Sequence, residues 1–308
     1  MTAPPEEARA TQPPPPGDPW TPIRLTRWSG DYLAEKGVEN GRLDAELLLA
    51  HVLGVKRLDL YLQFDRPLRP DELSAFKPLL RRRAAREPLQ YITGRASFRE
   101  LELTIDPRAL IPRPETEILV EEVLAWAREQ TEGVPLAALD LGTGTGAIAL
   151  SLHLEGGFAP VVATDASQEA LDLAGENVRA LGVGEGVELR KGELFSAVQA
   201  GEHFSVIVSN PPYIPEGSRE SLQEEVREWE PESALFAGPE GLDVLVPIIR
   251  GAPEFLSVGG LLALEVGVEQ ARKVARTMEE TGSFQEIRIR PDLAGRERVV
   301  LGVASGVG

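Results

Sequence analysis

The sequence predicts an α/β protein in which a doubly wound, Rossmann-like sheet of seven strands follows a small helical bundle and is joined to it by a β-hairpin. Three observations support this fold class. Apolar residues recur at helical spacing between residues 20 and 90, their period changes to two near residue 100, and short apolar runs then alternate with helical stretches. Strands that alternate with helices are typical of a parallel sheet covered on both faces.

The N-terminal part divides into a leader and a helical domain. Residues 1–19 contain seven prolines and almost no aliphatic side chains, so we expect a disordered leader with little apolar surface to bury. A proline inside a helix removes a backbone hydrogen bond, and we expect the last helix of the following domain to begin at Pro78. That domain, residues 20–90, is predicted to form four or five short helices on the spacing of Leu43, Leu47, Leu48, Val52, Leu53, Leu73, Phe76, Leu79 and Leu80.

The rest of the chain predicts the hairpin and the sheet. Apolar and polar residues alternate between residues 91 and 113, which predicts a hairpin within a linker of residues 91–114. The second domain, residues 115–308, opens with a helix at about residues 116–129. Its parallel strands are expected at five apolar runs, residues 136–141, 161–164, 187–189, 204–209 and 261–266. Two closing runs, separated only by a turn, predict a hairpin that makes one of the seven strands antiparallel: residues 284–289 and 298–302.

Composition excludes several kinds of site. The chain has no cysteine, which rules out disulfides, thiolate metal ligands and thiol nucleophiles, and its three histidines make a metal site unexpected. No run approaches the roughly 20 apolar residues of a membrane span, and the start lacks the basic and apolar regions of a secretory signal. We therefore expect a soluble cytoplasmic protein that binds no membrane.

The charge of the chain is concentrated in its second domain. The net charge is −17; residues 21–110 hold 16 basic and 13 acidic side chains, whereas residues 111–308 hold 15 and 33. Nucleic-acid binding depends on basic side chains that displace counterions from phosphates. Direct binding of nucleic acid is therefore not expected.

A glycine-rich loop, Gly142-Thr143-Gly144-Thr145-Gly146, directly follows the first predicted strand of the sheet and opens a helix. Glycine lets a backbone turn sharply and approach a ligand closely. Such a loop fits an S-adenosylmethionine site, a dinucleotide site or a purely structural turn. The glycines at every second position, Asp140 in the strand end and the absence of a following Lys-Ser/Thr pair favour S-adenosylmethionine. Asp165 ends the next strand, where a carboxylate can bind both ribose hydroxyls.

A second motif, Asn210-Pro211-Pro212-Tyr213, follows the fourth predicted strand, at the edge where open parallel sheets bind ligands. A proline-rich turn would end a strand, but it would not account for the amide and the aromatic ring beside the prolines. Because prolines fix φ and lack N–H groups, the carbonyls of Asn210 and Pro211 are rigid acceptors. They can bind both hydrogens of a planar NH2 group while the Tyr213 ring stacks on its face. The motif favours methylation of an amide or amino nitrogen.

These motifs resemble those of the HemK-type protein-(glutamine-N5) methyltransferases, which modify the glutamine of the GGQ motif in class 1 peptide-chain release factors. The resemblance covers about residues 21–303. The Asn-Pro-Pro-Tyr sequence alone also occurs in adenine-N6 DNA methyltransferases and some rRNA methyltransferases, but the Pro-Arg-Pro-Glu-Thr-Glu segment with the helical N-terminal part is specific to this family. Further matching segments are Leu43-Asp44-Ala45-Glu46, Arg82-Arg83, Pro88-Leu89-Gln90-Tyr91-Ile92-Thr93-Gly94, Leu110-Ile111-Pro112-Arg113-Pro114-Glu115-Thr116-Glu117, Glu230-Pro231, Gly241-Leu242-Asp243 and Leu264-Glu265-Val266-Gly267.

The resemblance implies a class I methyltransferase fold, S-adenosylmethionine as cofactor with S-adenosylhomocysteine as product, and class 1 release factors as protein substrates. It implies that Gly142, Thr143, Gly144, Thr145 and Gly146 wrap the methionyl part of the cofactor and that Asp165 holds the ribose. The segment beside the adenine reads Gly192-Glu193-Leu194-Phe195, with Glu193 in place of the family's more usual Asp and Leu194 next to it.

The same resemblance makes Asn210, Pro211 and Tyr213 the candidate catalytic residues. With Pro212 they would bind the substrate glutamine, and Asn210 would also contact the cofactor. The helical domain is expected to recognise the protein substrate, and the enzyme is expected to be a monomer.

The remaining polar residues leave alternatives open. Arg113 and Glu115 either stabilise the domain junction as hinge residues or shape the cofactor or substrate channel. His51 lies in a predicted helix, where a core or surface role is expected, and His153 and His203 have no partner motif. No side chain is an obvious strong base, so none is assigned and the proton is expected to leave to solvent. The acidic run is either a solvated face or a surface for the basic side of a release factor: Glu224, Glu225, Glu228, Glu230 and Glu232.

Two rival functions remain. One is methylation of an exocyclic amine of adenine or guanine in DNA or rRNA, which the acidic second domain disfavours. The other is a cofactor-binding regulator without catalysis, which would have no use for an amide clamp.

Overall fold

The computed structural model describes residues 18–130, 133 and 135–305, so the expected disordered leader lies outside the described residues except for its last two. By internal packing the chain divides into two compact units. One comprises the chain up to Gly94 together with Glu224–Trp229, and the other comprises Arg95–Gln223 and Glu230–Gly308.

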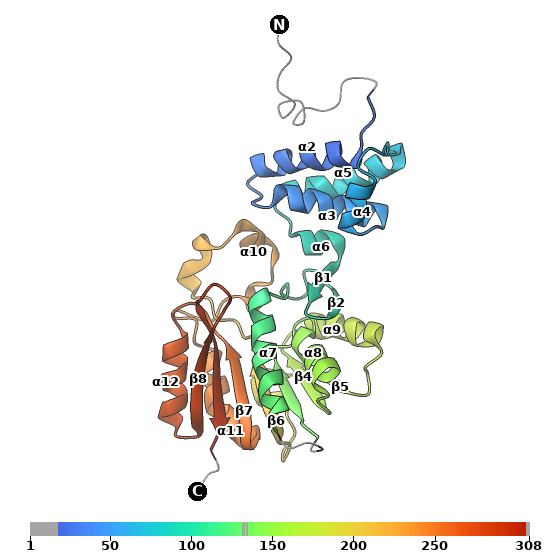
Figure 1. The fold of residues 1–308 in the computed structure, drawn as a ribbon. Coiled ribbons are helices and arrows are strands. Elements are labelled where there is room, and N and C mark those ends of the chain that lie inside the picture. Colours follow the sequence, from blue (N-terminus) through green and yellow to red (C-terminus); the bar gives the residue numbers. More distant parts are fainter. Residues whose placement is uncertain (1–17, 131–132, 134, 306–308) are drawn as a thin grey trace. The chain divides into compact units, whose positions relative to one another are not determined.

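The N-terminal unit is a helical bundle (Figure 1). Its core is formed by buried aliphatic and aromatic side chains, among them Leu33, Leu48, Leu49 and Phe76. A short helix from later in the chain, α10 (Glu224–Trp229), groups with this unit. The other helices of its described part are α2 (Pro22–Glu35), α3 (Gly41–Leu53), α4 (Arg57–Leu62), α5 (Pro70–Ala84) and α6 (Leu89–Thr93).

The course of α5 corrects one prediction. The helix begins at Pro70 and runs through Pro78, where we expected a helix to begin. Pro70 occupies the first turn, in which a missing N–H costs little, and Glu72 accepts a hydrogen bond from the Arg69 backbone N–H at 2.8 Å. Burial of Phe76 and Leu80 on either side offsets the backbone hydrogen bond that Pro78 removes.

The predicted hairpin is present but shorter than expected. Strands β1 (Arg95–Phe98) and β2 (Leu101–Thr104) pair in an antiparallel manner. Residues 91–93, expected in the hairpin, belong to α6, because burial of Ile92 in the core of the bundle takes precedence over the alternating pattern. Residues 105–113 form a loop instead of a strand.

The second unit contains the predicted seven-stranded sheet, in the order β5–β4–β3–β6–β7–β9–β8. All neighbouring strands are parallel except at β9, which is antiparallel to both β7 and β8, so the expectation of one antiparallel strand is confirmed. Strand order reverses beside β3, and the carboxyl edge at such a reversal is where open sheets bind ligands. The strands are β3 (Ala138–Leu141), β4 (Val161–Asp165), β5 (Val187–Lys191), β6 (Phe204–Ser209), β7 (Leu256–Glu265), β8 (Phe284–Pro291) and β9 (Glu297–Ala304).

Helices cover both faces of this sheet (Figure 1). Successive strand residues point to opposite faces, so Ala138 packs in the core on one side and Leu139 in the core on the other. On the first face lie α7 (Pro114–Arg128), α8 (Ala147–Gly156) and α9 (Gln168–Leu181); on the second lie α11 (Leu245–Phe255) and α12 (Ala271–Thr281). Across the residues described, none of the helices combines the length and apolar character that crossing a membrane requires.

Candidate active site

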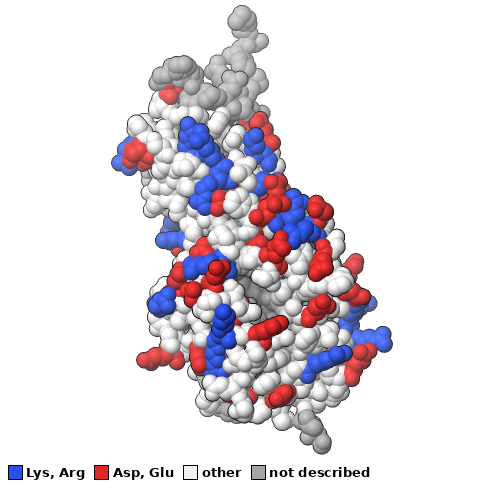
Figure 2. All heavy atoms as spheres, turned by 180° about the vertical axis from the view of Figure 1, so that it is seen from behind, with Lys and Arg blue, Asp and Glu red and all other residues white. Residues whose placement is uncertain are grey.

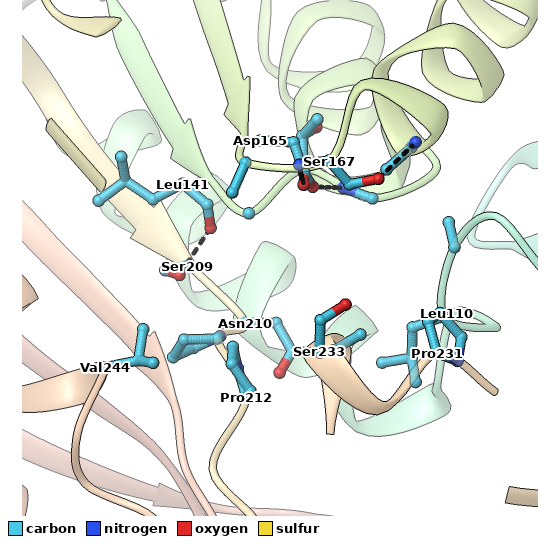
Figure 3. A pocket seen from close by; sticks show the side chains of 18 of the residues that line it. Leu110, Leu141, Asp165, Ser167, Ser209, Asn210, Pro212, Pro231, Ser233 and Val244 are labelled. Atoms are coloured by element: carbon cyan, nitrogen blue, oxygen red, sulfur yellow. Dashed lines mark hydrogen bonds between the residues drawn. The ribbon is translucent and has the colours of Figure 1, made fainter. Parts of the chain in front are cut away.

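A cavity of about 630 Å³ lies at the carboxyl edge of the sheet, within the second unit. In Figure 3, Asp165 and Ser167 lie on one side of it and face Asn210 and Pro212 on the other. The structure thus brings most of the sequence-predicted site residues together, but Gly146 and Tyr213 are not among the lining residues. Those that line the cavity are Gly142, Thr143, Gly144, Thr145, Asp165, Glu193, Leu194, Asn210, Pro211 and Pro212.

The glycine loop adopts a conformation that needs its glycines. Gly142, Gly144 and Gly146 have φ angles of 75°, 55° and 84°, which are left-handed values that other residues rarely adopt. The Asp165 carboxylate supports this loop, accepting hydrogen bonds from the Gly144 backbone N–H at 2.9 Å and from the Ser167 backbone N–H at 2.8 Å. Asp165 therefore both lines the cavity and braces the loop opposite Asn210.

We expect Asp165→Ala to weaken S-adenosylmethionine binding by ~1.5–3 kcal/mol, the range for hydrogen bonds to a charged partner, while leaving release-factor binding unchanged. Calorimetric titration with each ligand measures both effects. Asp172→Ala is a matched control, because Asp172 is exposed on α9 away from the cavity lining. Unchanged cofactor affinity would show that Asp165 is not the ribose acceptor, and equal losses for both ligands would indicate a damaged fold.

Asp140 is buried beneath the glycine loop. Its Oδ2 accepts hydrogen bonds from the Thr143 hydroxyl at 2.7 Å and the Ala149 backbone N–H at 3.2 Å, while Oδ1 has no partner. Burial raises the pKa of the Asp140 carboxyl to about 7, and the negative charge of Asp165 acts in the same direction. Because the folded chain holds this proton more tightly than the unfolded chain, Asp140 stabilises the fold fully below pH 3.8 and loses that contribution as pH rises to about 7.

In Asp140→Asn the side chain keeps its shape but no longer ionises, so this variant can be compared with wild type. The free energy of unfolding of wild type should fall relative to the variant by about 1 kcal/mol per pH unit between pH 5 and 7, then level off. Urea unfolding followed by circular dichroism at several pH values measures the difference. Glu230 and Glu265, whose pKa values burial also raises, are present in both proteins and cancel. A difference that does not vary with pH would contradict the assignment.

Asn210 lies directly after β6, and its side-chain amide is satisfied on one side only. Nδ2 donates to the Thr116 hydroxyl at 3.0 Å, whereas Oδ1 is buried and has no partner. A buried acceptor without a partner is costly, on the order of 1–3 kcal/mol, unless a ligand supplies the donor. Since Asn210 lines the cavity, Oδ1 is an acceptor available to a ligand's N–H.

The hydrogen bonds continue beyond Thr116 into the protein. The Thr116 hydroxyl donates to Glu265 Oε2 at 2.6 Å, and Tyr213 Oη donates to Glu265 Oε1 at 3.1 Å. Arg298 Nη2 donates to Tyr213 Oη at 3.0 Å and lies 3.9 Å from Glu265 Oε1. Burial raises the pKa of the Glu265 carboxyl, against the opposing effects of Thr116, Arg298 and Tyr213. Burial likewise raises the pKa of Tyr213, which keeps its hydroxyl a donor.

The Tyr213 hydroxyl is held by Glu265 and its ring packs against the apolar core on the second face of the sheet, and stacking of this ring on a substrate stays a prediction. The backbone around it is also held: Gln270 Nε2 donates to the Tyr213 carbonyl at 2.9 Å and to the Glu240 carbonyl at 3.0 Å. Gly241 lies so close that a Cβ atom there would come within 2.0 Å of the Tyr213 carbonyl oxygen. These contacts fix the Tyr213 end of the Asn-Pro-Pro-Tyr loop.

An ion pair with a buried carboxylate supports another part of the cavity wall. Arg113 pairs with Glu230, which is 5% exposed and also accepts from the Ile111 backbone N–H at 3.3 Å. Their neighbours Pro112 and Pro231 line the cavity, so Arg113 holds two lining segments together without lining it itself. Glu115 instead pairs with Arg296 at 3.2 Å.

The interpretation of the acidic run as a solvated face is wrong for two of its members. Glu230 is buried in the ion pair with Arg113. Glu225, within the N-terminal unit, accepts from Arg83 Nη2 and Arg86 Nε, each at 2.8 Å. The spacing of acidic residues along one segment does not reveal arginines that are distant in sequence.

Family models match both parts of the chain: a PrmC N-terminal domain at residues 24–94 and a methyltransferase small domain at residues 116–226. A release factor glutamine methyltransferase from Geobacter sulfurreducens is 44% identical over 283 residues, which cover 92% of this chain and 96% of that relative. The chain belongs to the release factor glutamine methyltransferase family. Two further release factor glutamine methyltransferases, from Chlorobaculum tepidum and Deinococcus radiodurans, are 41% and 42% identical, over 89% and 87% of this chain and 94% and 93% of theirs.

Among solved structures, the fold resembles that of the hMettl16 catalytic domain in complex with MAT2A 3′UTR hairpin 1. The TM-score is 0.55 at 16% identity, over 74% of this chain and 81% of that one. At that identity the likeness concerns the fold alone, and it agrees with the Rossmann-like methyltransferase fold predicted from the sequence.

Several lining residues were not assigned a role from the sequence. They lie in segments quoted above only for their match to the release factor glutamine methyltransferase family, which is the signal that could have pointed to them. They are Leu110, Pro112, Thr116, Pro231 and Asp243. Val244, Pro247 and Ile248 complete the lining near the start of α11 and carry no such signal, because apolar residues at helical spacing are ordinarily core.

Proposed function

We propose that this methyltransferase transfers a methyl group from S-adenosylmethionine to the side-chain amide nitrogen of the glutamine in the GGQ motif of class 1 release factors. The observation that carries the proposal is the buried Oδ1 of Asn210, an unpartnered acceptor at the cavity that the glycine loop and Asp165 also line. An acceptor there suits a substrate NH2 group. The names of the relatives at about 40% identity support the same substrate.

The residues around the cavity fit the proposed cofactor. The glycine loop would hold the methionyl part, the Asp165 carboxylate has lone pairs left for ribose hydroxyls, and Glu193 and Leu194 would lie beside the adenine. When bound, S-adenosylmethionine supplies the methyl group on a positively charged sulfonium.

The chain's contribution to the reaction is alignment and polarisation. A glutamine amide attacks poorly because its nitrogen lone pair is delocalised into the carbonyl. Acceptance of its N–H hydrogens by Asn210 Oδ1 and the Pro211 carbonyl would orient the nitrogen toward the methyl group and stabilise the positive charge that develops there. The N–C bond would form as the S–C bond is lost, which would leave S-adenosylhomocysteine, and the nitrogen's extra proton would go to solvent.

We assign recognition of the release factor to the N-terminal unit. Helix α4 and the turn after it expose apolar side chains, with Leu58 and Leu62 75% and 80% exposed, and contiguous exposed apolar residues often mark protein contacts. Direct binding of nucleic acid is not proposed. On the face shown in Figure 2, basic and acidic side chains are interspersed and the basic ones form no continuous band. We propose a cytoplasmic monomer, since a chain without cysteine suits a reducing compartment.

Mass spectrometry of a purified release factor tests the function. After incubation with the protein and S-adenosylmethionine, the GGQ peptide should gain one methyl group on its glutamine. An unmodified glutamine, or transfer to the amines of a DNA or rRNA fragment tested in parallel, would overturn the proposal.

A further inference from the structure

The Asn210 side chain lies at one end of a series of hydrogen bonds. The direction of donation along this series is set at its other end, by Arg298. Arg298 has only N–H donors, so at 3.0 Å it must donate to Tyr213 Oη, and the single hydroxyl hydrogen of Tyr213 is then directed to Glu265 Oε1 at 3.1 Å. Glu265 accepts at both of its oxygens, from Tyr213 at Oε1 and from the Thr116 hydroxyl at Oε2, the latter at 2.6 Å. Thr116 has no second hydrogen, and its oxygen therefore accepts from Asn210 Nδ2 at 3.0 Å.

This order decides which end of the Asn210 amide meets the cavity. The two orientations of an asparagine amide have almost the same shape, so packing alone does not distinguish them. With Nδ2 engaged by Thr116, Oδ1 is the atom left without a partner. The reversed amide would present N–H donors to the N–H donors of a substrate amide.

We propose that Thr116 and Glu265 are positioning residues of the methyltransferase, which hold the Asn210 amide with Oδ1 available to the substrate nitrogen. The proposal rests on the proposed function, because it needs a substrate that donates an N–H to Asn210. Glu265 is fully buried and acts through Thr116; Thr116 acts through Asn210. Their positions in the fold suit this role, since Glu265 ends β7 beside β6 and Thr116 lies in the first turn of α7.

The sharpest test is Glu265→Gln, which leaves the side-chain volume almost unchanged but reverses the direction of donation in the hydrogen bonds from residue 265 through Thr116 to Asn210. With the glutamine carbonyl kept for the Tyr213 hydroxyl, its NH2 group faces Thr116, whose hydroxyl must then accept from it and donate to Asn210. The Asn210 amide turns over, and its donors meet the substrate. We expect kcat on intact release factor to fall about 10- to 100-fold, as for a misplaced reacting group, with S-adenosylmethionine affinity and KM for release factor near those of wild type.

Thr116→Val removes the hydroxyl without a large change of shape, and it should lower kcat to a similar extent. Thr116→Ser keeps the hydroxyl and should restore most of the activity. Thr26→Val is the matched control, because Thr26 is also buried and its hydroxyl donates to carbonyls of its own helix α2, that of Pro22 at 2.8 Å and that of Ile23 at 3.4 Å. Thermal unfolding of all three variants separates loss of activity from loss of fold.

A double-mutant cycle shows whether Thr116 acts through Asn210. In an Asn210→Ala background, Thr116→Val should cause no further loss of single-turnover rate, because there is no amide left to orient. The proposal would be overturned by any one of three results: rate losses that multiply in the double variant, a wild-type kcat in Glu265→Gln, or failure of Thr116→Ser to restore activity. If wild type itself leaves release factor unmodified, it is the proposed function that fails, and this is seen before any variant is compared.

Discussion

Asn210→Ala is expected to reduce kcat for methylation of intact release factor by roughly 10²- to 10³-fold, the scale of one lost preorganised hydrogen bond at a reacting group. The variant removes Oδ1, the buried acceptor left unpartnered in the structure. It leaves the glycine loop and Asp165 in place, so the affinity for S-adenosylmethionine should change much less. Single-turnover methylation followed by mass spectrometry gives the rate, and calorimetry gives the affinity.

The controls for Asn210→Ala address the loop that carries the residue. The Tyr213 carbonyl remains held by Gln270 and the Tyr213 hydroxyl by Glu265, so the backbone should keep its course. A thermal midpoint close to that of wild type would verify this. Turnover near that of wild type on intact release factor would contradict the role of Asn210 as substrate acceptor.

The sequence was sufficient for those parts of the site that depend on backbone conformation. The glycine loop could be located because three closely spaced left-handed residues need glycine, and Asp165 because the end of a parallel strand places it at the edge of the sheet. The seven strands could be located from the apolar runs, because strands buried on both faces are continuous apolar segments.

Features that depend on long-range side-chain pairing could not be read in this way. The chain from Arg298 to Asn210 joins residues from four elements or their ends, and no spacing within one segment encodes it. The hydrogen bond from the Tyr213 hydroxyl to Glu265 is another such pairing, because the two residues are 52 positions apart. The expected helix start at Pro78 rests on local propensity, which the tertiary packing of α5 overrides.

Removal of the N-terminal unit is expected to abolish most activity on intact release factor while S-adenosylmethionine binding persists. The cavity is lined by residues of the second unit alone, which explains the retained binding. Helix α10 groups with the removed unit, and truncation at Gly94 would leave Glu225 without Arg83 and Arg86. The truncated chain should therefore also carry Glu225→Gln, and calorimetric titration with S-adenosylmethionine should establish that it is folded before activity is compared.

The decisive measurement compares intact release factor with a short GGQ peptide, using full-length and truncated protein side by side. A flexible peptide loses conformational entropy on binding, whereas a folded substrate held at a second surface presents its glutamine at high effective concentration. Truncation should thus lower methylation of the protein far more than that of the peptide. In the full-length chain, Leu58→Ser with Leu62→Ser should raise KM for release factor only, since both side chains are exposed on α4. Equal losses on the two substrates after truncation would instead make the N-terminal unit a scaffold for the cavity.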